Sequence, residues 1–391
     1  MMKRLFRLIY GSVRQGCLYV MSRPLFLVSI VAIPLVSAFL MLNLMSEGLA
    51  NRVPTAIVDL DGSELSRTLA ANIDAMQNTD VVATYASFTE ARDAVQRGEI
   101  NGFFLIPENF SSEAVAGRSP EISYYINYAY VVPSSLMFKG FKTVSVLSNG
   151  ALVKATLTSA GLADGSASAM LQPIVADMHL INNPWMSYPV YMSNSFIPGI
   201  LALMVMIVTV FSITDDIKRG TSPQWIDSCC GSIIIAVMGR LAPQTLLFTL
   251  TGWVIQLSIF GWLGFPLHCH IAVMMAAMLL LVMACQGFAV LVCGIIPNMR
   301  LALSVCSLIS VLAFSIGAFT IPVEDMYGWV GIISYILPIR YYFMIYIDQA
   351  LNGIDLYYSR YYFMALLIFV LLSFVPLFNL KRMCRRPVYI P

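Results

Sequence analysis

Long stretches without a charged residue constrain the fold of this chain more than any other feature of its sequence. Residues 196–213 and 301–323, for example, contain no Asp, Glu, Lys or Arg. A helix that crosses a bilayer needs about 20 mainly apolar residues, because the hydrocarbon core is about 30 Å thick. Charged residues make up only 11% of the chain, against about 25% in soluble domains. The sequence therefore predicts six transmembrane helices, at residues 24–45, 191–213, 232–265, 271–297, 301–323 and 361–380.

A further apolar segment, residues 326–339, is too short to cross the membrane. Its 14 residues would span about 21 Å as a helix, at about 1.5 Å per residue. A second short apolar piece follows at residues 341–347. Because backbone turns inside a membrane only where protein or a water-filled cavity surrounds it, we expect residues 324–350 to form a re-entrant hairpin.

Basic residues at both ends of the chain predict its orientation. Five Lys or Arg precede the first apolar stretch and four follow the last, with no acid among them. Since Lys and Arg concentrate on the cytoplasmic side of membrane proteins, residues 1–23 and 381–391 are both expected in the cytoplasm. Six spans satisfy this condition. Apolar residues fall on one face of the first segment, which predicts an amphipathic helix on the inner membrane surface.

Residues 46–190, between the first two predicted spans, read as a separate domain outside the cytoplasm. They hold 14 acidic and 8 basic residues, a net charge of −6. Strand-like and helix-like patterns alternate along them, which predicts an α/β fold. Ser87, Glu90 and Gly98 have the spacing of a helix capping box and a C-terminal glycine. The predicted strands are residues 53–61, 80–86, 100–107 and 121–130.

Three motifs carry a resemblance to a known family. Residues 56–69 read AIVDLDGSELSRTL, residues 196–200 read FIPGI, and residues 317–342 contain GAFTIPVEDM and YILPIRYY. In this order they resemble the permease subunits of type-2 ABC exporters, in the bacterial branch with a large extracytoplasmic domain. The resemblance covers nearly the whole chain. It implies a multi-pass α-helical protein of the bacterial inner membrane, which exports a substrate with ATP hydrolysed by a separate subunit.

The resemblance also assigns a role to residues 214–231, as a cytoplasmic coupling loop that docks on the ATPase. Gly220 suits the end of one helix, and Ser222 and Pro223 suit the start of another; an ordinary solvated loop is the alternative. Lys218 and Pro223 stand where the family often has acids, which leads to the hypothesis of a second, different permease subunit as partner. The residues assigned to ATPase coupling are Asp216, Gly220, Thr221, Trp225 and Ile226, of which Trp225 and Ile226 are expected to serve as apolar anchors.

Polar residues in or beside the predicted spans are candidates for the translocation path and its gate. Arg240 is expected either to reach lipid phosphates or to line the inner path. Arg340, at the predicted hairpin turn, either gates the outer exit or anchors the hairpin near the headgroups. Three glutamines either line the translocation path or pair between helices; they are Gln244, Gln256 and Gln286. The candidate hairpin and gate residues are Pro322, Glu324, Pro338 and Arg340.

No motif for chemistry on a substrate is found. The sequence lacks a phosphate-binding Gly-x-x-x-x-Gly-Lys-Ser/Thr loop, and the three residues His268–Cys269–His270 are too close together to form a tetrahedral metal site alone. We therefore expect no enzyme activity, metal or cofactor in this chain, with ATP and Mg²⁺ bound by the partner. The expected partners are an ABC ATPase, a second permease subunit of the same or a different kind, membrane lipid and, by resemblance, a periplasmic adaptor and an outer-membrane channel; a net charge of +2 gives no sign of nucleic acid.

Two other functions compete with export. A non-transporting receptor or scaffold would use the α/β domain to bind a partner, and co-purification of an ATPase separates it from the exporter. An ion-coupled transporter would need acids inside its spans and internal repeats, and the sequence has neither within the six predicted spans.

Overall fold

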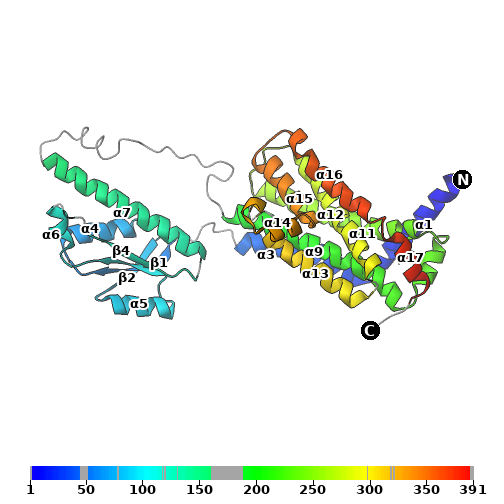
Figure 1. The fold of residues 1–391 in the computed structure, drawn as a ribbon, viewed down its shortest axis with the longest axis horizontal. Coiled ribbons are helices and arrows are strands. Elements are labelled where there is room, and N and C mark those ends of the chain that lie inside the picture. Colours follow the sequence, from blue (N-terminus) through cyan, green and yellow to red (C-terminus); the bar gives the residue numbers. More distant parts are fainter. Residues whose placement is uncertain are drawn as a thin grey trace. The chain divides into compact units, whose positions relative to one another are not determined.

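The computed structural model describes residues 2–44, 52–76, 79–116, 118, 120–129, 131–159, 188–296, 298–317, 319 and 322–387. The chain divides into two compact units (Figure 1). One consists of Glu47–His179 and is called the α/β unit below. The other consists of Met1–Ser46 and Leu180–Pro391 and is called the membrane unit.

The α/β unit combines strands and helices, as predicted, and its four strands form one mixed sheet. The strands lie in the order β2-β1-β3-β4, with β1 parallel to both β2 and β3 and β4 antiparallel to β3. Residues alternate between the two faces along β1, because side chains of a strand point to opposite sides in turn. Ile57 faces the core under α4 (Glu64–Asp74) and α7 (Val131–Ser159), whereas Val58 faces α5 (Phe88–Arg97). The strands are β1 (Val53–Asp59), β2 (Thr79–Tyr85), β3 (Gly102–Ile106) and β4 (Ser123–Ile126).

Local sequence signals set the ends of the helices in this unit. The Ser87 hydroxyl accepts a hydrogen bond from the Glu90 N–H at 3.3 Å, and Gly98 ends α5 with a φ of +74°. Ser63 caps α4 in the same way, through the Ser66 N–H at 3.1 Å. The predicted Ser87 cap and the helix end at Gly98 are therefore confirmed, and the Glu90 carboxylate accepts from the Ala86 N–H at 3.3 Å, one residue before the cap. The fourth strand is shorter than expected, and α6 (Phe110–Val115) was not predicted.

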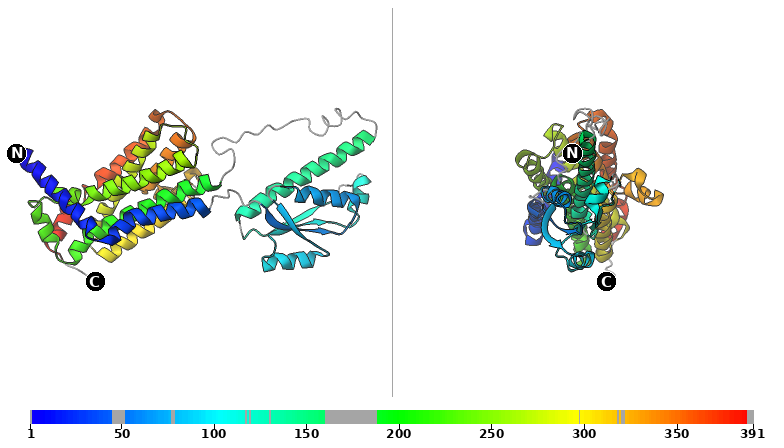
Figure 2. Two further views of the ribbon diagram at one scale, coloured as in Figure 1. Left: turned by 180° about the vertical axis from the view of Figure 1, so that it is seen from behind. Right: turned by 90° about the vertical axis from the view of Figure 1, so that its left-hand side faces the viewer.

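The membrane unit is almost entirely helical within its described residues. Six of its helices are long and apolar enough to cross a membrane, or up to seven if one bent pair is counted as a span. Six candidate spans are therefore confirmed. Figure 2 shows α1 at one end of the bundle and α3 along its side. The elements are α1 (Met2–Met21), α2 (Pro24–Leu27), η1 (Val28–Ala32), α3 (Ile33–Leu44), α9 (Tyr188–Lys218), α10 (Ser222–Ser228), α11 (Ile233–Leu257), η2 (Ser258–Trp262), α12 (Ile271–Ile295), α13 (Met299–Ile316), η3 (Val323–Asp325), α14 (Gly328–Ser334), α15 (Pro338–Ile345), η4 (Tyr346–Leu351), α16 (Leu356–Leu372) and α17 (Leu377–Arg385).

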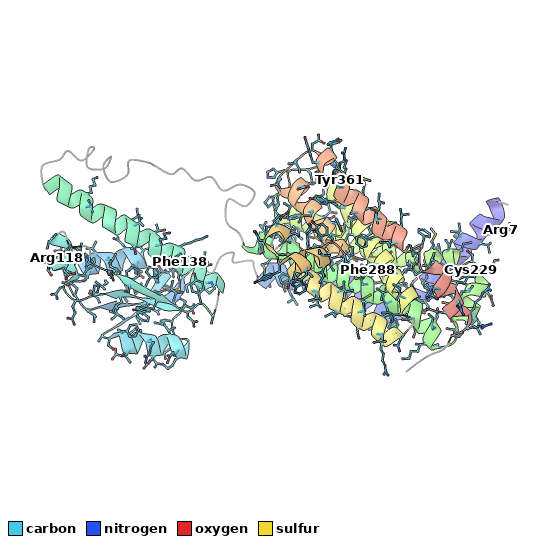
Figure 3. The ribbon with its side chains drawn as sticks, in the orientation of Figure 1. Arg7, Arg118, Phe138, Cys229, Phe288 and Tyr361 are labelled. Carbon is cyan, nitrogen blue, oxygen red and sulfur yellow. The ribbon has the colours of Figure 1, made fainter. Side chains whose placement is uncertain are left out.

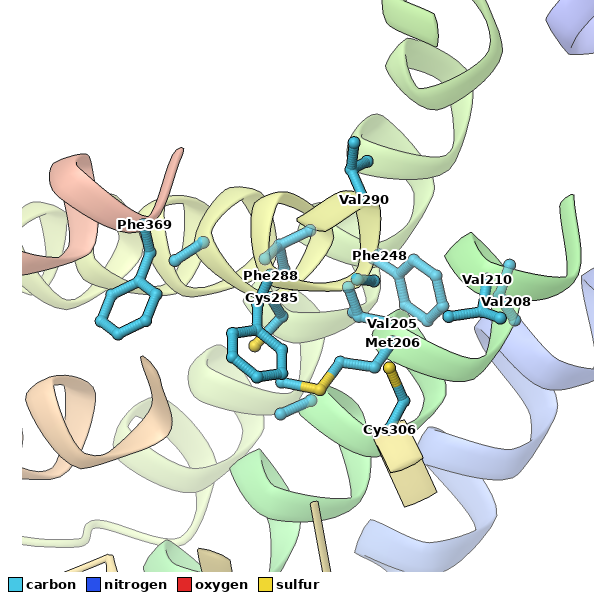
Figure 4. Packing of buried hydrophobic residues seen from close by; sticks show 14 of the residues in the cluster. Val205, Met206, Val208, Val210, Phe248, Cys285, Phe288, Val290, Cys306 and Phe369 are labelled. Carbon is cyan, nitrogen blue, oxygen red and sulfur yellow. The ribbon is translucent and has the colours of Figure 1, made fainter. Parts of the chain in front are cut away.

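The core of this unit lies where α9, α11 and α12 meet (Figure 4). Phe248 of α11 packs among valines of α9, and Cys285 and Phe288 of α12 contribute to the same cluster. In the apolar stretch of α12, 72% of the residues are buried, against 22% in the apolar stretches of the first span and of α13. The central helix is thus α12, and the outer helices expose apolar faces that suit lipid.

The predicted hairpin region contains two helices that meet at a sharp angle. α14 and the segment Pro338–Leu351 are bent by 86° relative to each other. Pro338 is the first residue of α15, so the break falls directly before the proline, as expected from the missing N–H of its ring. The geometry is compatible with a broken span as well as with a re-entrant loop, and the re-entrant arrangement stays a prediction.

Candidate functional site

The helix that precedes the predicted coupling loop continues through both acids, to Lys218. It ends in a Schellman motif, in which the Gly220 N–H donates to the Ile217 carbonyl at 3.2 Å and the Thr221 N–H donates to the Asp216 carbonyl at 3.0 Å. This motif requires a residue with positive φ, which glycine adopts without strain. Gly220 has a φ of +72°, so its predicted place at the helix end is confirmed.

The next helix, α10, begins one residue earlier than the sequence suggested. Thr221 stands at its N-cap position, so the expectation that Ser222 is the cap is wrong. The Ser222 hydroxyl instead donates to the Cys384 carbonyl of α17 at 2.8 Å. The hydroxyl that local sequence rules assign to the N-terminus of the helix therefore donates to an acceptor that is distant in the sequence. The result fastens α10 to the last helix of the chain.

Asp215 and Asp216 bind different arginines. The Asp215 carboxylate accepts from the Arg23 Nη1 at 2.6 Å and from the Arg219 Nε at 3.0 Å. The Asp216 carboxylate accepts from Arg240 and also from the Thr221 hydroxyl, at 3.1 Å. These ion pairs join the start of α2, the end of α9 and the first third of α11. Together with Tyr19 they are called the charge cluster, whose members are Tyr19, Arg23, Asp215, Asp216, Arg219 and Arg240.

Arg240 is the centre of this cluster. Its guanidinium carbon lies 3.6 Å from the centroid of the Tyr19 ring and 4.8 Å from that of Trp225. The side chain is buried and binds Asp216. Arginine stacks on aromatic faces while it donates in plane to a carboxylate. One side chain thus touches α1, α9 and α10 from its own place in α11, a pairing that neither sequence reading of Arg240 included.

The Tyr19 hydroxyl binds both members of the Arg23–Asp215 ion pair, while the Tyr19 ring stacks on Arg240. The hydroxyl accepts from Arg23 at 2.9 Å and donates to the Asp215 carboxylate at 3.4 Å. Burial, opposed by the nearby Arg240, raises the pKa of Tyr19 to about 12. The phenol therefore keeps its proton at physiological pH and remains a donor to the carboxylate.

The role of α1 was missed by sequence reasoning beyond its amphipathic pattern. A Cβ at Gly16 would collide with the backbone of Gly239, and one at Gly239 would collide with Ser12. The Ser12 hydroxyl donates to the Ile235 carbonyl at 2.9 Å, and the Cys229 thiol donates to Ser12 at 3.4 Å. Figure 3 shows Cys229 at the same end of the membrane unit as Arg7 of α1. Small residues allow such close helix packing. Ser12 and Gly16, four residues apart, are the sequence signal that would have revealed it.

Trp225 and Ile226, the apolar anchors predicted in the loop, are both buried in the core of the membrane unit. Gln224 and Asp227 are exposed on the opposite side of α10. The short helix is therefore fixed by one face and leaves the other free to bind. Together with the charge cluster, it brings Asp216, Gly220, Thr221 and Trp225 to one place, as the sequence grouped them.

The chain matches the family described as ABC-2 family transporter protein over residues 24–378. It belongs to this family. Among curated proteins, no relative matches the chain. An ABC-2 transporter of this kind is a multi-pass membrane permease, and the family implies an ATPase partner.

In this ABC-2 transporter the four predicted hairpin residues have different surroundings. Arg340 is buried, donates to the Ser334 hydroxyl at 3.1 Å and lies 4.3 Å above the Tyr335 ring. Arg340 belongs to α15, and its side chain therefore links this helix to the end of α14 across the bend. Pro338 is buried beside it. Pro322 and Glu324, in contrast, are exposed near η3.

The three glutamines face the interior of the ABC-2 permease. Gln256 donates to the Met274 carbonyl at 3.0 Å and to the Tyr342 hydroxyl at 3.2 Å. Gln286 accepts from the Thr245 hydroxyl at 2.7 Å. Gln244 is fully buried and has no hydrogen-bond partner in the part of the chain that the structure describes. Two of the three thus pair between helices, which was one of the two readings.

His270, directly before α12, has a structural role. The His270 Nδ1 accepts from the Ala272 N–H at 3.2 Å and so caps the helix. Within the described ranges, no group of three or more His, Cys, Asp or Glu is placed to hold a metal ion.

Proposed function

We propose that this chain is the permease subunit of an ATP-driven exporter, which moves its substrate outward across the bacterial inner membrane with ATP hydrolysed on a separate subunit. Membership of the ABC-2 transporter family supports the permease role. The observation that carries the coupling role is the attachment of α10 to the ends of two candidate spans through Trp225, Arg240 and Asp216. The proposal includes a substrate path through the permease, docking of an ATPase on α10 and an outward direction of transport.

Force on α10 would reach the spans directly. Trp225 packs against Arg240 of α11, whose guanidinium binds Asp216 at the end of α9. The Ser222 bond adds α17 to the same assembly. Because these contacts are short and buried, α10 and the ends of the three helices are expected to move as one body. The exposed Asp227 provides the surface that an ATPase would contact.

The docking proposal is tested by reversing one exposed charge. Asp227→Lys should lower co-purification of the ATPase and coupled ATP hydrolysis by about tenfold, the effect of about 1.4 kcal/mol of lost binding. Asp325→Lys, an exposed acid near η3, is the matched control and should leave both unchanged. Full association and export in Asp227→Lys would exclude α10 as the docking helix. Failure of any ATPase to co-purify with the unmodified chain would favour the receptor or scaffold function.

The orientation is also part of the proposal, with residues 46–190 outside and residues 1–23, 214–231 and 381–391 in the cytoplasm. Cys230 is exposed beside α10, and the side chain of Asp93 on α5 is 42% exposed. A membrane-impermeant maleimide should label Asp93→Cys in intact spheroplasts and Cys230 only after permeabilisation, with Cys230→Ser as the control. Labelling of Cys230 from outside would reverse the topology.

We further propose that the chain pairs with a second permease subunit, and that its partner is of a different kind. The support is Lys218 and Pro223, which replace acids that the family often has in this loop. Mass analysis of the purified complex tests this directly. A complex with one permease species and full ATPase coupling would show that identical subunits pair. An adaptor and an outer-membrane channel are the further partners proposed for the α/β unit.

A further inference from the structure

An open cavity of about 470 Å³ lies between α1, α10 and the adjoining parts of α9 and α11. Its volume is within the range of about 300–1,000 Å³ that is usual for sites of small molecules. Hydroxyl and amide side chains form part of its lining, among them Ser12, Gln15, Ser22 and Gln224, and the paired Arg240 and Asp216 form part of its wall. Such a lining offers many hydrogen bonds to a polar ligand.

The charged side chains of the cavity lining are Arg240 and Asp216, which pair with each other, and the rest of the charge cluster lies beside them. Arg240 is only 6% exposed, and although one of its nitrogens binds Asp216, its Nη1 has no acceptor among the residues that the structure describes. A buried donor without an acceptor is unfavourable unless a ligand or water supplies one. The cluster around it contains three arginines and two aspartates, a surplus of one positive charge. One phosphate group would balance that charge and supply the missing acceptor.

Apolar side chains beside the cavity show what else the ligand carries. Leu18 lines the cavity and is 59% exposed. Met21 and Leu25, which follow Leu18 along the chain, are 71% and 65% exposed, and Leu25 lies within the first candidate span. In a membrane-embedded permease, exposed apolar residues next to a span face acyl chains. A soluble anion would leave this surface without a partner, whereas a lipid covers it.

We propose that the cavity binds the headgroup of one anionic phospholipid, with its phosphate at Arg240 and its glycerol hydroxyls on the serine and glutamine side chains. The acyl chains then lie along Leu18, Met21 and Leu25. Phosphoglycerol suits the lining better than phosphoethanolamine, because the surplus charge is positive and the polar wall is rich in hydroxyl and amide groups. The lipid fastens α1 to α10, and this inference does not depend on the direction of transport.

Native mass spectrometry tests the proposal on the purified full chain, with its ATPase if one co-purifies. After delipidation, the protein is mixed with equimolar phosphatidylglycerol and phosphatidylethanolamine. One phosphatidylglycerol should be retained in about tenfold preference. Ser22→Leu, which puts a bulky side chain in the cavity lining, and Leu18→Asn, which removes the apolar contact, should each abolish the preference. Arg14→Gln, an exposed basic residue of the same helix outside the cavity, should retain it.

The other outcomes overturn the proposal. Equal retention of the two lipids would show that there is no headgroup site. Loss of the preference in Arg14→Gln would show adsorption to a basic helix rather than binding in a cavity. Displacement of the lipid by millimolar glycerol 3-phosphate or inorganic phosphate would assign the site to a soluble anion. Two variants are used because one of them could misfold. A variant with an unchanged thermal midpoint is folded, and its lipid preference decides the test.

Discussion

Neutralising Asp216 should destabilise the membrane unit far more than neutralising Asp215, although the two residues are adjacent. Asp216 pairs with Arg240, and these two side chains are only 10% and 7% exposed. Asp216→Asn therefore leaves a buried guanidinium without its carboxylate, a change that costs about 3–5 kcal/mol in the free energy of unfolding. Asp215→Asn releases Arg23 and Arg219, which are 25% and 58% exposed. Water replaces the lost partner there, so the expected cost is about 1 kcal/mol or less.

The comparison is made on the purified chain in detergent micelles, with unfolding by SDS followed by tryptophan fluorescence. A rescue variant isolates the cause. Replacing both partners of a buried ion pair by apolar side chains is often nearly neutral, so Asp216→Leu combined with Arg240→Met should recover most of the stability lost in either single variant. A methionine also packs well between Tyr19 and Trp225.

Two results would refute this reasoning. Equal shifts of the unfolding midpoint in Asp215→Asn and Asp216→Asn would show that burial of the partner does not decide the cost. A double variant that loses the sum of the two single effects would show that Asp216 and Arg240 stabilise the protein independently. Either result would also weaken the proposal that this pair carries motion from α10 to the spans.

Three further substitutions test the local geometry. Gly16→Val should push α1 away from Gly239 and cost about 1–3 kcal/mol in the free energy of unfolding. Gly11→Ala lies on the same helix, where a Cβ meets nothing within 4 Å, and should stabilise the helix by about 0.5–1 kcal/mol. The midpoint of SDS unfolding measures both changes. Ser222→Ala should cost about 1 kcal/mol and loosen α10, measured as faster hydrogen exchange of its amides, and an unchanged rate would mean that the bond to α17 does not hold it. Gly98→Ala places a side chain at a φ of +74° and should cost about 1 kcal/mol, raising hydrogen exchange in α5 about fivefold, with protection elsewhere in the chain as the internal control.

Sequence reasoning succeeded where the signal is local. The capping box at Ser87 and Glu90 and the helix end at Gly220 were predicted, because neighbouring residues supply both partners of each hydrogen bond. It failed at Ser222, whose hydroxyl finds an acceptor 162 positions away. A local rule assigns a local partner, and it has no access to a competitor that packing brings close.

The sequence by itself determined that this ABC-2 transporter chain has six candidate spans and a separate α/β unit. Partition into lipid depends on the apolar content of each segment, and that content is a property of the segment alone. Only the tertiary structure decided which charges meet. Arg240 and Asp216 are 24 positions apart, and Tyr19 and Asp215 are 196 positions apart. A buried charge is stable only where helix packing places its partner within hydrogen-bonding distance, and that distance is set by the whole bundle.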